Sequence, residues 1–315
     1  MYIVYLIAGL VLILAGANYL TDGSAELAKR FRISEFVIGL TVIAIGTSTP
    51  ELAVSFLSAL KGQTEMAIGN VVGSNLFNVF VTIGICALIR PLALTRENIR
   101  RDIPAGVAVS LLLLACGYYG GISRPMGIIM TVLFVMLIWY TIRSSKSEPA
   151  AQPQAPAEAG GRPRVWTVAL MVVGGLAALV GGGEMFVHGA TELARRLGVS
   201  ESVIAITLVA GGTSLPELAS SVTALLKGRG EMALGNAIGS NTANILLVLG
   251  LSATAHPLPL GQIGMVDLYM VLASAAALFL AAFTFRRRAI DRWEGTLFVM
   301  IYTAYIIWLI KHQAQ

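Results

Sequence analysis

The sequence predicts an all-α polytopic membrane protein with ten transmembrane helices, arranged as two inverted repeats of five helices. Three observations lead to this fold class: a low charge content, long apolar stretches that recur along the chain, and an internal duplication. Of the 315 residues, 56% are hydrophobic and only 12% are charged, whereas a soluble domain averages about 25% charged residues. This composition excludes a water-soluble globular protein and a disordered chain, so the lipid bilayer is the expected environment.

Apolar stretches long enough to cross a bilayer occur five times in each half of the chain. The first five predicted spans cover residues 2–22, 36–59, 66–89, 103–119 and 125–142. The other five cover residues 166–188, 202–225, 232–254, 266–285 and 293–311. Residues 144–164 are rich in Pro, Ala and Gln without an apolar period, so we expect a flexible spacer rather than a regulatory domain. The predicted domains are residues 1–143 and 165–315, joined by this linker.

The two halves share a duplicated segment. Ile33–Ile85 aligns without a gap on Val199–Leu251 at a constant offset of 166, with 27 identities in 53 positions. Shared hydrophobicity alone would not reproduce Pro, Glu, Ser and Asn at the same offsets, so the segment is an internal repeat.

The distribution of basic residues predicts the orientation. With the N-terminus outside, 17 of the 22 Lys and Arg residues fall on the cytoplasmic side, as the positive-inside rule requires. Both termini are then outside and the linker is cytoplasmic. Five spans per half is an odd number, so the second repeat enters the membrane inverted, which is typical of secondary transporters with a midplane site. Without a large regulatory insert or an organelle signal, the expected location is the inner (plasma) membrane of a prokaryote.

Two acidic residues at equivalent positions of the repeats lie inside apolar runs. Glu51 and Glu217 each follow Gly-Thr-Ser-x-Pro, and a charged group at this depth is expensive unless it has a partner or a task. Pro50 and Pro216 remove a backbone donor and clash with the preceding turn. We therefore expect these helices to break at the Thr-Ser, and the break to free backbone carbonyls near Ala44 and Ala210.

The residues around the predicted breaks are oxygen donors. In the second and third spans, and again in the seventh and eighth, we expect broken helices to form a midplane ion site. Carboxylates, hydroxyls and carbonyls suit Ca²⁺ and Na⁺ and are poor ligands for soft transition metals. Gly-Asn and Gly-Ser-Asn segments in the third and eighth spans add neutral oxygens, although their glycines are also typical of close helix packing. The predicted ligands are Glu51, Glu217, Thr47, Ser48, Thr213, Ser214, Ser74, Ser240, Asn78, Asn244 and the carbonyls of Ala44 and Ala210.

Two carboxylates give this site a charge of about −2, which one Ca²⁺ would neutralise, and two or three Na⁺ could take the place of that Ca²⁺. Both sets of ions cannot fit together. Mutually exclusive binding at one site, combined with inverted repeats, is sufficient for antiport.

The doubled motif, GTSxPE followed by GNxxGSNxxN, resembles the α-repeats of the sodium/calcium exchanger family, within the Ca²⁺/cation antiporter superfamily. The resemblance covers essentially the whole chain. It implies that Glu51 and Glu217 bind both Ca²⁺ and Na⁺, that Ser74 and Ser240 bind Na⁺, and that the Thr-Ser oxygens also ligate. The carbonyls of Ala44 and Ala210 would complete an outer and an inner Na⁺ site. The first and sixth spans resemble the long tilted helices that slide across the core. No cofactor, nucleic acid or obligate protein partner is implied.

The chain departs from several relatives, which carry Asp in the second repeat where this chain has Asn244. Both Asn78 and Asn244 are neutral, which argues against potassium co-transport. A proton/calcium antiporter and a cation channel remain the alternative functions. An intramembrane hydrolase is disfavoured because the sequence has no His-Glu-x-x-His and no Ser-His dyad in its apolar core, so the chain is not expected to be an enzyme.

Other polar groups have two possible interpretations. Glu184 and His188 are one turn apart in the sixth span. One interpretation is a proton-sensitive pair that tunes exchange. The other is a pair without a transport role, either buried and hydrogen-bonded or at the outer interface. Glu65 and Glu231 begin the third and eighth spans, where the helix macrodipole stabilises a carboxylate, although either could also attract ions. The four tryptophans near span ends are expected to be interface anchors: Trp139, Trp166, Trp293 and Trp308.

Overall fold

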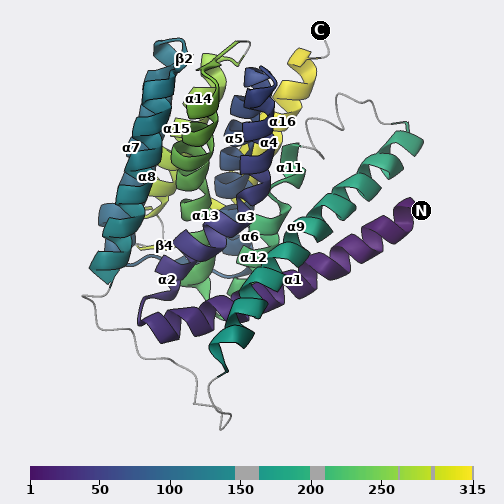
Figure 1. The fold of residues 1–315 in the computed structure, drawn as a ribbon, viewed down its shortest axis with the longest axis vertical. Coiled ribbons are helices and arrows are strands. Elements are labelled where there is room, and N and C mark those ends of the chain that lie inside the picture. The colour runs from purple at the N-terminus through teal and green to yellow at the C-terminus, as the bar shows by residue number, and fades with distance from the viewer. Residues whose placement is uncertain (146–162, 199–209, 262, 285–287, 314–315) are drawn as a thin grey trace.

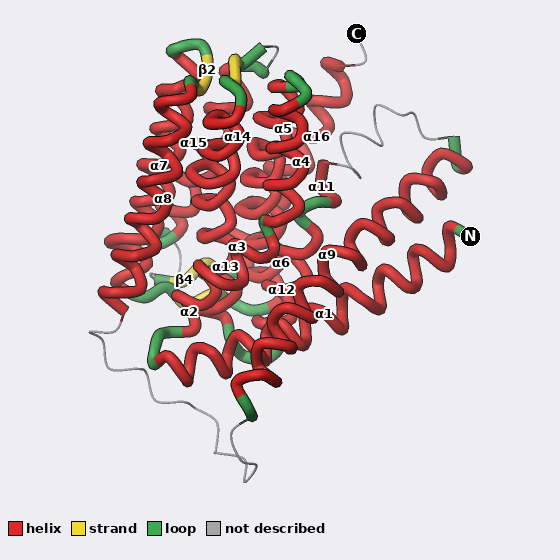
Figure 2. The backbone as a smooth tube through the Cα atoms, viewed as in Figure 1, coloured by secondary structure: helices red, strands yellow, loops and turns green. Residues whose placement is uncertain are grey.

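The computed structural model describes residues 1–145, 163–198, 210–261, 263–284 and 288–313. These residues are almost entirely helical, with four two-residue strands near the ends of the bundle (Figure 2). Most helices run alongside one another in one bundle, and two long helices lie inclined across its side (Figure 1). Most of the predicted linker, and residues 202–209 of the predicted seventh span, lie outside the described residues.

The first half of the chain contains the elements that were expected, with additional π-helical segments. In order, they are α1 (Tyr2–Phe31), α2 (Glu35–Ile38), π-helix η1 (Gly39–Ile43), α3 (Ala44–Thr47), α4 (Thr49–Leu60), α5 (Thr64–Leu76), π-helix η2 (Phe77–Ile83), α6 (Gly84–Ile89), β1 (Leu92–Ala93), π-helix η3 (Asn98–Asp102), α7 (Ile103–Tyr118), β2 (Gly121–Ile122) and α8 (Arg124–Ser145). The predicted first span, residues 2–22, is too short by about two turns, because α1 continues to Phe31 before Arg32 ends it in a left-handed conformation (φ 54°).

The described part of the second half follows the same plan. Its elements are α9 (Val165–Arg196), α11 (Ala210–Gly212), α12 (Leu215–Leu226), α13 (Gly230–Ala243), π-helix η5 (Asn244–Leu249), α14 (Gly250–Ala255), β3 (Leu258–Pro259), α15 (Met265–Ala281), β4 (Ala289–Ile290) and α16 (Arg292–Gln313). Like α1, α9 extends beyond its predicted span, which ended at residue 188.

Several helices have the length and apolar character needed to cross a membrane. Within the described residues there are six, and the bent pair α2–α3 and α4 makes a seventh if it is counted as one span. Apolar side chains on the outer surfaces of α1, α8, α9 and α16 are exposed, as a lipid-facing surface requires. The four predicted interface tryptophans are exposed as well. The chain is therefore a multi-pass membrane protein.

The third and eighth spans do not break, contrary to the prediction. Thr64–Ile89 and Gly230–Ala255 are each one continuous helix. Each contains a π-helical segment instead, η2 in the first and η5 in the second. A π-helical turn widens the helix and shifts the faces of the residues that follow it, and such turns are frequent at functional sites. The widened turns begin beside Asn78 and at Asn244, two of the predicted ligands.

Glycines form the contact between the two inclined helices. α1 and α9 share the most extensive contact of any pair of elements, and their facing glycines recur every seven residues. On α1 these are Gly9 and Gly16, and on α9 they are Gly175, Gly182 and Gly189. A Cβ at Gly16 would lie 2.7 Å from the carbonyl oxygen of Gly175, so the two backbones are in direct contact. Helix association in lipid depends on such close packing because no hydrophobic driving force acts between apolar helices.

Two short antiparallel strand pairs connect the halves. β1 pairs with β4, and β2 pairs with β3. Figure 1 places β2 and β4 at opposite ends of the bundle. The helical periodicity of the sequence did not predict these strands, because each lies in a short connection and forms only through its partner in the other half.

We predict that Gly16→Leu destabilises the protein while Gly174→Leu does not. A side chain at Gly16 would collide with the α9 backbone, whereas a Cβ at Gly174 meets no atom within 4 Å. Overpacking of this kind costs about 1–3 kcal/mol or more. Thermal unfolding of the purified protein in detergent should show a lower midpoint for Gly16→Leu and an unchanged midpoint for Gly174→Leu. Equal midpoints for the two variants would contradict close packing of α1 on α9.

Candidate functional site

Both predicted helix breaks are present at the Thr-Ser positions. Ser48 separates α3 from α4 with φ −79° and ψ 7°, and the two parts of this span are bent by 46°. Ser214 takes a similar conformation (φ −91°, ψ 4°) immediately before α12. Pro50 and Pro216 fall in the first turn of the helices that follow. Backbone N–H groups in the first turn of a helix have no acceptor within that helix, so proline loses no hydrogen bond there. Each proline is therefore compatible with the start of a new helix at the break.

The two breaks are joined through their carboxylates. Ser48 Oγ donates to Glu217 Oε1 at 3.2 Å, and Ser214 Oγ donates to Glu51 Oε1 at 3.2 Å. Ser74 Oγ, from α5, also donates to Glu51 Oε1 at 3.3 Å. Each repeat thus supplies a serine to the carboxylate of the other repeat.

The carboxylates are buried and only partly satisfied. Glu51 and Glu217 are 0% exposed. Within the described part of the chain, the Oε2 atoms of both have no hydrogen-bond partner. The same holds for Ser240 Oγ, which is also fully buried. Buried acceptors without a partner lose their hydration without compensation, so these oxygens form a cluster suited to a cation.

The predicted asparagines carry further unpartnered oxygens. Asn78 and Asn244 are 0% exposed. Neither amide atom of Asn78 has a partner among the residues described, and the same is true of Asn244 Oδ1. The other amide atom of Asn244, Nδ2, donates to Asn75 Oδ1 at 3.1 Å.

The threonine hydroxyls contact asparagines of the opposite repeat. Thr47 Oγ1 donates to Ile43 O at 3.0 Å and lies 3.3 Å from Asn236 Oδ1. Thr213 Oγ1 lies 3.4 Å from Asn70 Oδ1. Thr47 is buried, whereas Thr213 is half-buried. Both hydroxyls therefore lie in the crossing region of the two repeats, beside the broken turns.

One expectation about the backbone is wrong. The carbonyl of Ala44 is not freed by the break, because it accepts a hydrogen bond from the Ser48 N–H at 3.0 Å. The helix keeps its regular bonding up to Ser48 and changes direction only there. A carbonyl oxygen has a second lone pair, so this bond does not prevent it from binding an ion. Ala210 is the first described residue of its span, directly after residues that lie outside the described ranges.

Asn70 and Asn236 hold the helix starts in place, a role that sequence reasoning missed. Asn70 Nδ2 donates to the backbone carbonyl of Glu51 at 3.2 Å and to Ser55 Oγ at 2.9 Å. Asn236 Nδ2 donates in the same way to the carbonyl of Glu217 at 3.2 Å. Both asparagines are identical at the offset of 166, and this identity was the available signal. They tie each carboxylate-bearing helix to the helix that follows it.

Other polar groups lie away from the carboxylates. Glu184 and His188 are both exposed, so the interpretation as a buried pair is wrong. The His188 ring instead packs edge-on against Tyr5, with ring centroids 5.1 Å apart. Glu65 and Glu231 lie in the first turns of α5 and α13, where the macrodipole favours a carboxylate.

The donor set consists of two carboxylates and several neutral oxygens. No group of three or more His, Cys, Asp or Glu side chains comes together in the described ranges. The site is therefore unlike the nitrogen- and sulfur-rich sites that hold transition metals. It has the chemistry of a site for hard cations such as Na⁺ and Ca²⁺.

Comparison with known proteins agrees with this chemistry. The chain matches the sodium/calcium exchanger protein family over residues 1–143 and 167–311. The sodium/calcium exchanger MaX1 of Methanosarcina acetivorans is 32% identical over 342 residues, covering 96% of each chain. The inner membrane protein YrbG of Escherichia coli is 33% identical over 314 residues, covering 96% of this chain and 94% of YrbG. A solved structure of the sodium-calcium exchanger NCX_Mj, soaked with Na⁺ and Sr²⁺, superposes with a TM-score of 0.84 at 32% identity, covering 97% of each chain. The chain belongs to the sodium/calcium exchanger protein family.

Proposed function

We propose that this chain is a secondary active antiporter that exchanges Na⁺ for Ca²⁺ by alternating access at one site. The observation that carries the proposal is the pair of fully buried carboxylates, Glu51 and Glu217, each with an oxygen that no described residue satisfies. Two negative charges buried in a membrane protein are costly unless cations compensate them. Cations that bind there and can be replaced by other cations would make this a transport site. The names of MaX1 and NCX_Mj support Na⁺ and Ca²⁺ as those cations.

The charge of the site accounts for exchange rather than co-transport. One Ca²⁺ or two Na⁺ neutralise two carboxylates, and a third Na⁺ would bring the site to a net charge of +1. Either set would use the same carboxylate oxygens, so the two sets exclude each other. The proposed ligands are the two glutamates with the hydroxyl, amide and carbonyl oxygens of Thr47, Ser48, Thr213, Ser214, Ser74, Ser240, Asn78, Asn244, Ala44 and Ala210.

We infer ten spans in two inverted repeats, with domains at 1–143 and 165–315. The strand pairing supports this inference: β1 and β3 are equivalent at the offset of 166, and each pairs with a strand of the other half. The two sheets lie at opposite ends of the bundle in Figure 1, as inversion requires. α8 ends and α9 begins at the lower end, whereas α16 ends at the upper end. A cytoplasmic linker and external termini in a plasma membrane agree with this arrangement and with the basic residues.

Contacts of the inclined helices support alternating access. Lys227 Nζ lies 2.8 Å from Asp22 Oδ1 and donates to the carbonyl of Asn18 at 3.2 Å, which ties α1 to the turn after α12. The equivalents of Lys227 and Asp22 at the offset of 166 are Lys61 and His188. His188 packs on α1 instead. The inclined pair is thus tied to the bundle by an ion pair at one end, and the residues of that ion pair are not both repeated at the other end. Such a contact can break when the inclined helices move, without an identical contact forming at the opposite end.

The function is tested by Ca²⁺ uptake into proteoliposomes. Liposomes loaded with Na⁺ and diluted into Na⁺-free medium at equal pH should take up Ca²⁺, because outward Na⁺ movement drives inward Ca²⁺ movement. A matched set should carry only a pH gradient. We expect uptake only where internal Na⁺ is present.

The other outcomes identify the alternatives. Uptake driven only by the pH gradient would make the chain a proton/calcium antiporter. Uptake without any dependence on a counter-ion would make it a cation channel. Either result would overturn the Na⁺/Ca²⁺ assignment while leaving the oxygen site intact.

We predict that Glu51→Gln or Glu217→Gln abolishes this uptake and leaves the protein folded. Each change removes one negative charge but keeps the shape of the side chain. Loss of a charged ligand lowers Ca²⁺ affinity on the order of 100-fold. In ion-free buffer the thermal midpoint should stay the same or rise, because an uncompensated buried charge is removed. Undiminished transport in either variant would overturn the site.

We also predict that Asn244→Asp retains Ca²⁺ binding but changes the coupling ions. A third carboxylate would bring the site to about −3, so one Ca²⁺ would leave a negative charge that a monovalent cation or a proton must balance. Uptake measured at several Na⁺, K⁺ and H⁺ concentrations should show a new dependence on one of them. The same ion dependence in variant and parent would contradict a place for Asn244 in the site.

A further inference from the structure

Two asparagines form a reciprocal contact where the repeats meet. Asn75 Nδ2 donates to the backbone carbonyl of Asn241 at 3.3 Å, and Asn241 Nδ2 donates to the backbone carbonyl of Asn75 at 3.3 Å. They occupy equivalent positions on α5 and α13, at the offset of 166. Neither residue was among the predicted ligands, although both lie inside the Gly-Ser-Asn motif.

This contact fixes which way the Asn75 amide points. A backbone carbonyl only accepts hydrogen bonds, so the atom of Asn75 that faces Asn241 O must be the NH₂ group. The other amide atom, Oδ1, is then an acceptor, and its neighbour must donate. That neighbour is Asn244 Nδ2, at 3.1 Å. The polarity of the Asn244 amide therefore follows from a backbone carbonyl two hydrogen bonds away.

The remaining atom of Asn244 is an oxygen, on a π-helical turn that packs against one of the helices of the candidate site. Asn244 Oδ1 is buried and has no partner among the residues described. Asn244 follows Ser240 by four residues on one helix face. Ser74, the equivalent of Ser240, donates to Glu51, and η5 packs against α4, which carries Glu51. A cation at this site would meet a carbonyl oxygen, whereas a reversed amide would present two N–H donors to it.

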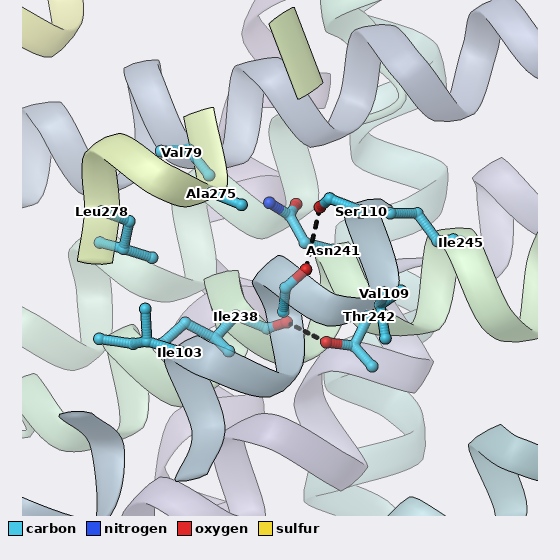
Figure 3. Close-up of a pocket in the computed structure, with 11 residues that line it drawn as sticks. Val79, Ile103, Val109, Ser110, Ile238, Asn241, Thr242, Ile245, Ala275 and Leu278 are labelled. Atoms are coloured by element: carbon cyan, nitrogen blue, oxygen red, sulfur yellow. Dashed lines mark hydrogen bonds between the residues drawn. The ribbon is translucent and has the colours of Figure 1, made fainter. Parts of the chain in front are cut away.

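The equivalent chain of hydrogen bonds in the other repeat is not closed. Asn241 Oδ1 has no partner within the described ranges, and neither do the amide atoms of Asn78, which would be its donor by symmetry. Asn241 instead lines a pocket together with Ser110 and Thr242 (Figure 3). The walls of this pocket come from α7, α13 and α15 and from the π-helical segments η2 and η5. Both hydroxyls in that pocket donate to carbonyls of their own helices, at 2.9 and 3.0 Å. The Asn241 side chain therefore does not orient Asn78 as Asn75 orients Asn244.

We propose that Asn75 is a positioning residue for ion binding: by accepting from Asn244 Nδ2, it keeps the Asn244 carbonyl oxygen directed into the site. The proposal rests on the proposed function only in taking the site to bind cations. Asn75 itself does not touch the ion. Its counterpart Asn241 makes the same backbone contact without orienting a ligand, so the chain contains its own matched control.

The test compares Asn75→Leu with Asn241→Leu. Each variant loses one side-chain donor to the opposite backbone carbonyl, but only Asn75→Leu removes the acceptor of Asn244. The measurement is the thermal unfolding midpoint of detergent-purified protein at increasing Ca²⁺ concentrations. The readout is the Ca²⁺ concentration at which half of the full rise in this midpoint is reached. This binding readout does not depend on coupling to Na⁺. We expect Asn75→Leu to raise this concentration on the order of tenfold. Asn241→Leu should change it by no more than about twofold. Asn75→Ala removes the same acceptor without filling its space and should behave as Asn75→Leu does.

A double variant separates positioning from a general structural effect. A carboxylate presents an acceptor oxygen in either orientation, so Asn244→Asp should make Asn75 unnecessary for orientation. In the Asn244→Asp background Asn75 Oδ1 would face a carboxylate oxygen instead of a donor, so Asn75→Leu should not weaken Ca²⁺ binding by more than about twofold. Equal effects of the leucine variants at 75 and 241, or a tenfold effect that persists in the Asn244→Asp background, would overturn the proposal. A parent protein that binds Ca²⁺ but shows no Na⁺-driven uptake would instead overturn the proposed function alone.

Discussion

The structure depends on the electrostatics of two carboxylates held away from water. Glu51 and Glu217 are fully buried, and each keeps one oxygen that no described residue satisfies. Removing ionised groups from water costs several kcal/mol each unless an opposite charge and hydrogen bonds compensate. The surrounding hydroxyls and amides supply hydrogen bonds but no positive charge. A bound cation would supply that charge, so in the exchanger that we propose the affinity of the site would come from the energy that this burial otherwise costs.

The duplication explains how two such helix starts can be stable beside each other. Ser48 and Ser214 each donate to the carboxylate of the opposite repeat. Asn70 and Asn236 each hold the backbone of their own repeat. The carboxylate of each broken helix accepts a hydrogen bond from a serine of the other repeat, so each repeat supplies a donor to the other. A single repeat would leave one carboxylate with fewer donors and no opposite break, which is a physical reason for the two halves to be retained together.

The sequence was sufficient for features that are encoded locally. Pro and Glu after Gly-Thr-Ser predicted both breaks, and the repeated Ser positions included Ser48, Ser214 and Ser74, which donate to the carboxylates. Features that depend on packing between distant segments were not predictable in this way. The cross-repeat serine bonds and the role of Asn236 need a partner helix in place. The π-helical turns at η2 and η5 had no signal in the helical periodicity of the sequence. The Ala44 carbonyl was misjudged because the helix keeps its hydrogen bond until Ser48 and bends only after it.

The departures from two-fold symmetry identify where the protein differs between its two ends. Asp22 on α1 faces Lys227, whereas the residue equivalent to Asp22 on α9 is His188. Perfectly equivalent repeats would give two opposite-facing states of equal energy, because every interaction broken at one end would form again at the other. Substitutions between repeats change that balance, and a difference of about 1.4 kcal/mol shifts a two-state population tenfold. In the cycle that we propose, the oxygen core shared by the repeats would set which ions bind, while the residues that differ between them would set which side of the membrane the empty site faces.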